Sequence, residues 1–190
     1  MKKIALFLIV LTFAFTAQAQ LTKGNWIIGG NATYSKNASK GTDAGNSKIR
    51  ALDILGNIGY FPLPKFATGL ILNTLFTKQK LPQSNTGSTQ NNLGGGVFIR
   101  YYFLKESNRI NVFTDEGLVY SVLKTKTAGT HFNDFKSLSY YFSAGTVVFV
   151  NSSVGAEFIV SYNRSKAVKF DSRGETLQFR VGLQFYLENQ

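Results

Sequence analysis

The chain of 190 residues contains no cysteine, one histidine and three prolines. Without cysteine there is no disulfide framework, no thiolate metal site and no cysteine nucleophile. The single histidine, His131, likewise excludes a histidine-rich metal centre, and we expect neither a cofactor nor a metal. No acid, base and nucleophile stand at a spacing that indicates catalysis, so we do not expect an enzyme.

Long apolar runs are equally scarce. Only residues 4–15 approach one, and about twelve residues are fewer than the ~20 that a membrane-spanning helix needs. The run follows a short positive head and precedes Ala17 and Ala19, which have the small-residue spacing that signal peptidase recognises. We therefore predict a cleaved secretory signal peptide over 1–19 and one domain over 20–190. Such a domain enters a membrane only as a closed β-barrel.

The clearest secondary-structure signal lies near the carboxyl end of the chain. From Leu177 to Leu187 every second residue is apolar, and the residues between them are Gln, Arg, Gly, Gln and Tyr. A period of two is typical of a β-strand with one apolar face, and no helix produces it. Weaker alternation recurs upstream. Together these patterns predict strands at 23–36, 46–61, 66–79, 91–104, 109–124, 136–150, 153–166 and 174–187.

The connections between these strands alternate in length. Three are tight, at 61–65, 105–109 and 151–152, and four are longer and polar, at 36–45, 80–91, 125–135 and 167–173. Short turns on one side and longer loops on the other are typical of outer-membrane barrels. Strands of ~14 residues, each rising about 3.3 Å and tilted by ~40°, are long enough to cross a ~25 Å apolar band. We predict an all-β fold, an eight-stranded antiparallel up-and-down transmembrane β-barrel.

The predicted strand at 109–124 interrupts the alternation, because Asp115 and Glu116 are adjacent. Neighbouring side chains point to opposite faces of a strand. Either one carboxyl group faces the apolar side, or a β-bulge at this point redirects it.

Aromatic residues concentrate near both ends of the predicted strands, as in the girdles that mark the membrane interfaces of such barrels. Those on the tight-turn side are Trp26, Tyr60, Phe61, Phe66, Tyr101, Phe103 and Phe149. Those on the loop side are Tyr34, Phe76, Tyr120, Phe135, Tyr140, Tyr162 and Phe170. Ordinary β-rich composition is the alternative explanation, since strands favour aromatic residues in any case.

The positive net charge of +11 is concentrated beside the four longer connections. The cations assigned to this basic rim are Lys36, Lys48, Lys78, Lys80, Lys124, Lys126, Arg164, Lys166 and Lys169. A ring of cations suits contact with phosphorylated lipopolysaccharide, and a merely solvated rim is the alternative. No nucleic-acid motif accompanies the charge and the chain is exported, so we do not expect nucleic acid as a partner.

Five charged residues fall on the polar side of the predicted strands, which a membrane barrel turns inward. They are Asp53, Arg100, Asp115, Glu157 and Arg180. An eight-stranded barrel is only just wide enough to be filled by side chains, and charges in so narrow a lumen must be paired or hydrated. We expect a carboxylate–guanidinium network that satisfies itself and blocks diffusion. The alternative is a gated narrow pore in which the pairs exchange.

Three tracts, at 59–70, 115–120 and 144–153, resemble small outer-membrane β-barrels of the OmpA-transmembrane, OmpX and general porin-family type. The resemblance covers nearly all of the chain after the signal segment. It implies escort by periplasmic chaperones, insertion by the barrel assembly machinery, and roles from structural integrity to adhesion. Many members end on an aromatic residue, whereas this chain continues past Phe185-Tyr186-Leu187 with Glu188-Asn189-Gln190.

The sequence thus indicates an integral outer-membrane β-barrel protein of structural or surface-interaction type. We expect a monomer with a side-chain-filled lumen and basic extracellular loops, surrounded by outer-membrane lipids including lipopolysaccharide. One alternative is a narrow porin-like channel for small solutes. A second is a soluble lipocalin-like barrel that binds an apolar ligand, which requires the apolar faces to point inward. Alternation alone does not separate the two orientations, but the inward assignment of charges and the strand length favour lipid outside.

Overall fold

The computed structural model describes residues 21–41, 45–80, 87–127, 130–131, 134–168 and 172–189, so the predicted signal peptide over 1–19 lies outside the described residues. The strands are β1 (Trp26–Gly41), β2 (Gly45–Leu63), β3 (Phe66–Lys80), β4 (Gly87–Tyr102), β5 (Ile110–Thr127), β6 (Thr130–His131), β7 (Phe135–Phe149), β8 (Val154–Ala167) and β9 (Arg173–Leu187). Among the segments described there is no helix long and apolar enough to cross a membrane.

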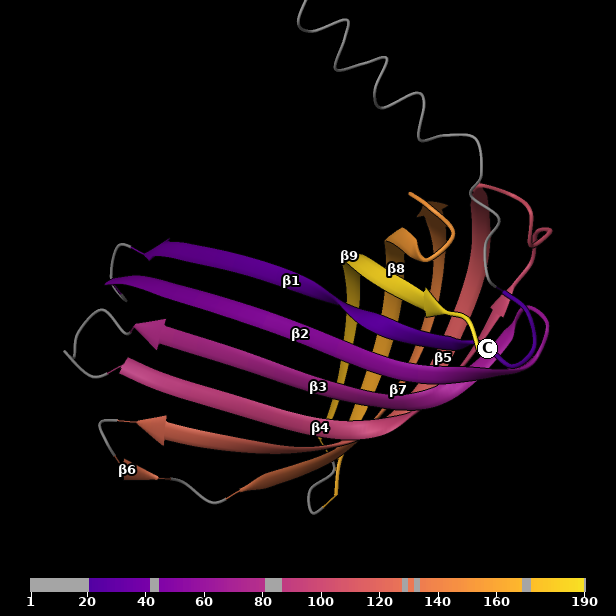
Figure 1. Cartoon of the computed structure of the whole chain (residues 1–190). Helices are drawn as coiled ribbons and strands as arrows, with labels where there is room; N and C mark the ends of the chain where they lie inside the picture. Colours follow the sequence, from indigo (N-terminus) through magenta and orange to yellow (C-terminus); the bar gives the residue numbers. More distant parts are fainter. Residues whose placement is uncertain are drawn as a thin grey trace, which may run out of the picture.

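The described strands form a closed antiparallel barrel with eight strands around its wall, and strands that follow one another in the chain lie side by side (Figure 1). Pairing of β9 with β1 closes the ring. The ninth strand, β6, has only two residues and pairs with the end of β5. The next strand of the barrel wall beside β5 is β7. The prediction of an eight-stranded antiparallel up-and-down barrel is confirmed. The segment that holds β6 was expected to be loop throughout.

The prediction of four long loops is wrong in its extent. β1 and β2 stay paired from Lys36–Arg50 as far as Gly41–Gly45, and β4 begins at Gly87. Backbone hydrogen bonds extend the ladder whatever side chains it carries. Hydrophobic alternation, by contrast, ends where a strand leaves the apolar band, so the sequence pattern does not reveal these polar strand ends.

The two faces of the barrel have opposite polarity. Outward-facing apolar side chains are strongly exposed, among them Phe179 at 75% and Leu72 at 69%. Inside, Arg100 and Glu157 are 3% and 0% exposed. The apolar residues of the alternating carboxyl-terminal strand therefore lie outside and its polar residues inside.

Aromatic side chains stand on the outer face near both ends of the strands. At the turn end, Trp26 packs against Tyr60 with ring centroids 5.3 Å apart. The girdle prediction is wrong for Phe61 and Phe149, which are 0% exposed inside the barrel. Phe170 lies outside the described residues.

Strand β5 has no bulge at its two adjacent acidic residues. Its register with β4 and with β7 runs through both without a shift. Asp115 therefore points into the barrel, where it is 7% exposed, and Glu116 points outward. Of the two alternatives that the sequence left open, the structure has the first, with one carboxyl group on the apolar face.

Candidate functional site

A buried guanidinium organises the middle of the lumen. The register of β4 with β5 sets Arg100 directly opposite Asp115, and β8 contributes Glu157 from the other side of the barrel. The Nε and Nη2 atoms of Arg100 donate to Asp115 Oδ2 at 3.0 and 2.6 Å, and Nη1 donates to Glu157 Oε1 at 2.6 Å. One planar cation thus holds two carboxylates through donors that its rigid fork fixes in direction, unlike the rotatable donors of a lysine ammonium.

Neutral polar side chains occupy the remaining oxygen atoms of these carboxylates. The hydroxyl of Tyr141 donates to Asp115 Oδ1 at 2.8 Å. Gln184 Nε2 donates to Glu157 Oε2 at 3.3 Å and to Asn57 Oδ1 at 2.9 Å. Each member of the network is therefore satisfied, which is the condition for keeping charge in a low-dielectric interior.

A second charged pair lies nearer the loops. Arg180 Nη2 stands 3.8 Å from Asp53 Oδ2, and Gln178 Oε1 accepts from the Nε and Nη2 atoms of the same guanidinium at 3.1 and 2.5 Å. Asn73 Nδ2 donates to Asp53 Oδ1 at 2.7 Å. The structure thus places all five sequence-derived lumen charges inside, but as two groups rather than as one network.

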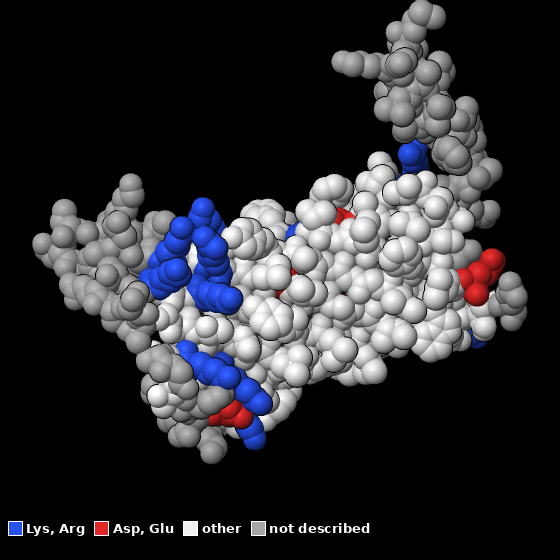
Figure 2. All heavy atoms as spheres, turned by 60° about the vertical axis from the view of Figure 1, so that its left-hand side comes forward, with Lys and Arg blue, Asp and Glu red and all other residues white. Residues whose placement is uncertain are grey.

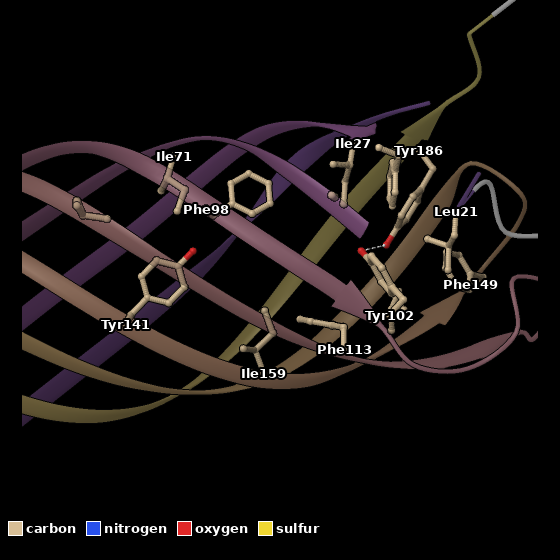
Figure 3. Packing of buried hydrophobic residues seen from close by; sticks show 14 residues of the cluster. Leu21, Ile27, Ile71, Phe98, Tyr102, Phe113, Tyr141, Phe149, Ile159 and Tyr186 are labelled. Atoms are coloured by element: carbon tan, nitrogen blue, oxygen red, sulfur yellow. Dashed lines mark hydrogen bonds between the residues drawn. The ribbon is translucent and has the colours of Figure 1, made fainter. Parts of the chain in front are cut away.

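An aromatic layer, which the sequence analysis missed, closes the barrel on the tight-turn side of the Arg100 centre. Tyr102 and Tyr186 meet inside the barrel with their hydroxyl oxygens 2.9 Å apart (Figure 3). Phe113 lies on the tight-turn side of the guanidinium, with its ring centroid 4.4 Å from the Arg100 Cζ atom. Tyr102 and Phe113 are both 0% exposed. Their inward positions in the alternation were the available signal, but it was obscured because Tyr101 and Tyr102 are adjacent aromatic residues of β4.

The loop side of the lumen holds a polar cup of about 210 Å³. Its walls carry mostly hydroxyl and amide side chains, and the Asp53–Arg180 pair lines it. The Asn92 Oδ1 atom is buried there without a hydrogen-bond partner among the described residues. A polar cavity of this size accommodates several water molecules, whose share of liquid volume is about 30 Å³ each.

The basic rim surrounds the loop end of the barrel. Figure 2 shows Lys and Arg side chains gathered at one end, with a broad band of mainly uncharged surface beside them. In register, Lys36 stands opposite Arg50, and Arg50 stands opposite Lys78. Arg164 has one loose ion pair, 3.6 Å from Glu175, with both side chains more than half exposed. Lys169 lies outside the described residues.

Eight of the nine predicted rim cations therefore lie at one end of the barrel, and the ninth, Lys169, is the one outside the described residues. A groove of about 350 Å³ on the outer face has a cationic part, formed by Arg164, Lys166 and Arg173, and an apolar part. Leu118, Leu138 and Tyr140 line the apolar part. No group of three or more metal-ligating side chains occurs in the part of the chain that the structure describes.

Comparison with known proteins gives the fold but not a family, because no family model and no curated protein matches the chain. Among solved structures, Neisserial surface protein A is similar with a TM-score of 0.54 and 14% identity, covering 86% of this chain and 99% of that one. The outer membrane protein OprG from Pseudomonas aeruginosa has a TM-score of 0.51 and 14% identity, covering 90% and 99%. The chain has the fold of the small outer-membrane β-barrels.

Proposed function

We propose that the protein is an integral, non-catalytic outer-membrane β-barrel of structural or surface-interaction type, with a lumen blocked by its own side chains. The observation that carries this is the polarity of the barrel, with exposed leucines and phenylalanines outside and a buried charge network inside. Water satisfies no backbone group in a bilayer, but a closed barrel satisfies its own. A lipocalin-like binder needs the opposite arrangement, with Leu177, Phe179 and Val181 inside, whereas all three are more than 60% exposed.

Two layers support a blocked lumen. The Arg100 centre spans the barrel from β4 and β5 to β8, and the aromatic layer beneath it packs around the Tyr102–Tyr186 contact. Opening a pore requires the separation of buried ion pairs, and removal of one partner from such a pair costs about 3–5 kcal/mol. The polar cup on the loop side is therefore closed toward the tight-turn side. This favours a surface or structural role over the diffusion of solutes through the lumen.

The basic rim supports contact with phosphorylated lipid in the outer leaflet. Like charges on neighbouring strands destabilise a sheet, and Lys36, Arg50 and Lys78 form such a row across three strands. Phosphate groups of lipopolysaccharide relieve this repulsion by charge-assisted hydrogen bonds. The adjoining groove, apolar below and cationic above, suits a lipid with acyl chains under its phosphates. We also propose insertion by the barrel assembly machinery after escort by periplasmic chaperones.

Cell fractionation with a heat-modifiability gel tests the location. We expect the protein to sediment with outer membranes, to require detergent for extraction, and to migrate faster unboiled than boiled. Protease added to intact cells then tests whether the loop ends face outside. Recovery as a monodisperse detergent-free monomer contradicts the membrane location and supports the lipocalin-like alternative.

Planar-bilayer recording tests the blocked lumen. We expect no stepwise conductance from the wild-type chain or from Arg180→Ala, because the Arg100 centre and the aromatic layer remain. The double variant Arg100→Ala/Phe113→Ala removes one member of each layer and is expected to conduct. Stepwise conductance from the wild-type protein would support the narrow-channel alternative, for which the polar cup is an entrance already present.

A further inference from the structure

An acidic side chain faces lipid near the middle of the membrane. On β5 the outward positions run from Ile110 to Val122, and Glu116 is the middle one. Those twelve steps rise about 30 Å for a strand tilted by ~40°, so Glu116 lies about 15 Å from either end of this row of outward residues. A glutamate side chain does not reach either interface from that depth.

The side chains directly opposite Glu116 on the two neighbouring strands are apolar. The register sets Ile99 of β4 and Phe142 of β7 on its two sides, and Leu118 follows it on β5. These three side chains are 46%, 40% and 50% exposed on the outer face. Among the described residues Glu116 has no hydrogen-bond or ion-pair partner. A carboxyl group left without a partner in hydrocarbon is costly, and intramembrane ionisable residues usually mark functional contacts.

The face that carries Glu116 is also hollowed. Thr68, Val97, Ile99, Leu118 and Tyr140 line a mainly apolar groove of about 310 Å³, and Glu116 forms part of its wall. Apolar grooves also occur elsewhere on the outer face, but this one adjoins an acidic side chain. The groove gives space for side chains of a packed neighbour beside the carboxyl group.

We propose that Glu116 and the groove beside it form a contact between two copies of this chain in the membrane. All copies insert with the same side out, so the Glu116 of a second copy lies at the same depth. A two-fold axis along the membrane normal brings identical residues together. An uncharged carboxyl group costs less in hydrocarbon than a charged one, and two such groups each donate one O–H···O hydrogen bond to the other in an arrangement with the same two-fold symmetry.

This inference rests on the membrane location proposed above and differs from the monomer that the sequence led us to expect. It selects a second copy over other partners because such a copy supplies the required donor, at the required depth, from this chain alone. A lipid or a foreign protein would have to bring its own donor to that depth.

The absence of cysteine makes a single introduced thiol a clean reporter. The chain without its predicted signal segment is refolded into phosphatidylcholine vesicles, with a heat-modifiability gel and flotation to verify insertion. Leu118→Cys places a thiol on the proposed contact and retains Glu116. Ala32→Cys, on the outer face of the diametrically opposite strand β1, is the matched control. Because a direct disulfide requires Cα atoms within about 7 Å, a short bifunctional thiol reagent is used to trap dimers.

We expect Leu118→Cys to cross-link well above Ala32→Cys at the same lipid-to-protein ratio. Adding Glu116→Leu should lower association about tenfold, the size of two intramembrane hydrogen bonds. Glu116→Gln should retain it, because two side-chain amides also exchange hydrogen bonds reciprocally. Equal cross-linking at the two thiols, or no loss with Glu116→Leu, overturns the proposal. Equal losses with Gln and Leu also overturn it and point to a cationic partner instead. Failure to float or to show heat modifiability rejects the membrane location itself.

Discussion

Replacing Arg100 by methionine tests whether the lumen is held by ion pairs. The substitution removes four hydrogen bonds from the guanidinium, three of them to carboxylates, and leaves Asp115 and Glu157 without a cation. Both residues are buried, at 7% and 0% exposure. Removing one partner from a buried pair costs about 3–5 kcal/mol, so we expect the free energy of unfolding to fall by that amount.

Urea unfolding of the vesicle-inserted barrel measures this loss. Trp26, the only tryptophan, stands 43% exposed on the outer face at the turn end and reports insertion by its fluorescence. Arg109→Met, an arginine exposed in a tight turn, is the control and should change stability by less than about 0.5 kcal/mol. A loss below about 1 kcal/mol for Arg100→Met would refute the reasoning, since that is the range of exposed pairs.

A compensated variant separates lost charge from lost packing. Arg100→Met combined with Asp115→Asn and Glu157→Gln makes the centre neutral but keeps amide oxygens for Tyr141 and Gln184. Replacing a whole buried ion network by well-packed hydrophobic residues is often close to neutral in stability, and the two amides likewise leave no unpaired charge. We therefore expect most of the lost stability to return. If the triple variant is as unstable as the single one, packing rather than charge dominates this centre.

Two further predictions concern the strand ladder and the rim. A Cβ atom on Gly96 would meet the Leu118 carbonyl oxygen at 1.9 Å, whereas on Gly95 its nearest contact is 3.9 Å. In the same urea assay Gly96→Ala should therefore cost about 1–3 kcal/mol and Gly95→Ala should not, and equal costs contradict the close approach. Lys78→Glu should weaken binding to lipopolysaccharide-containing vesicles by about 1 kcal/mol per unit of charge near the surface, but Lys105→Glu, at the opposite end, should not. Equal effects of the two reversals, measured by vesicle co-sedimentation, reduce the rim to a solvated surface.

The strands were predictable because each one crosses an apolar band, and that band imposes the period of two on its outward residues. The same period placed Arg100, Glu157 and Arg180 inside. It fails at strand ends, where Tyr101 and Tyr102 are both aromatic and only the register shows which one is buried. The aromatic layer of the lumen was therefore missed, and Phe61 was assigned to the outer girdle.

The composition of the network was less predictable than its charges. Tyr141, Gln184 and Asn57 complete the Arg100 centre from β7, β9 and β2. Their inward positions follow from alternation, but their meeting depends on how the strands are staggered around the barrel. That stagger is a property of closure, which no single strand encodes. The separation of Asp53 and Arg180 from the other three charges has the same origin.

The adjacent pair on β5 shows what closure forces and what it leaves free. To seat Asp115 beside Arg100 without a bulge, the strand must turn position 116 toward lipid. The register therefore accounts for the direction of Glu116 but not for its chemistry, because leucine, isoleucine or valine serves at most other outward positions. Inside, Asp115 and Glu157 accept hydrogen bonds from several donors, whereas Glu116 has no hydrogen-bond partner among the described residues. Since the fold does not require that carboxyl group, the proposed contact gives it a role, because a second copy carries a donor at the same depth.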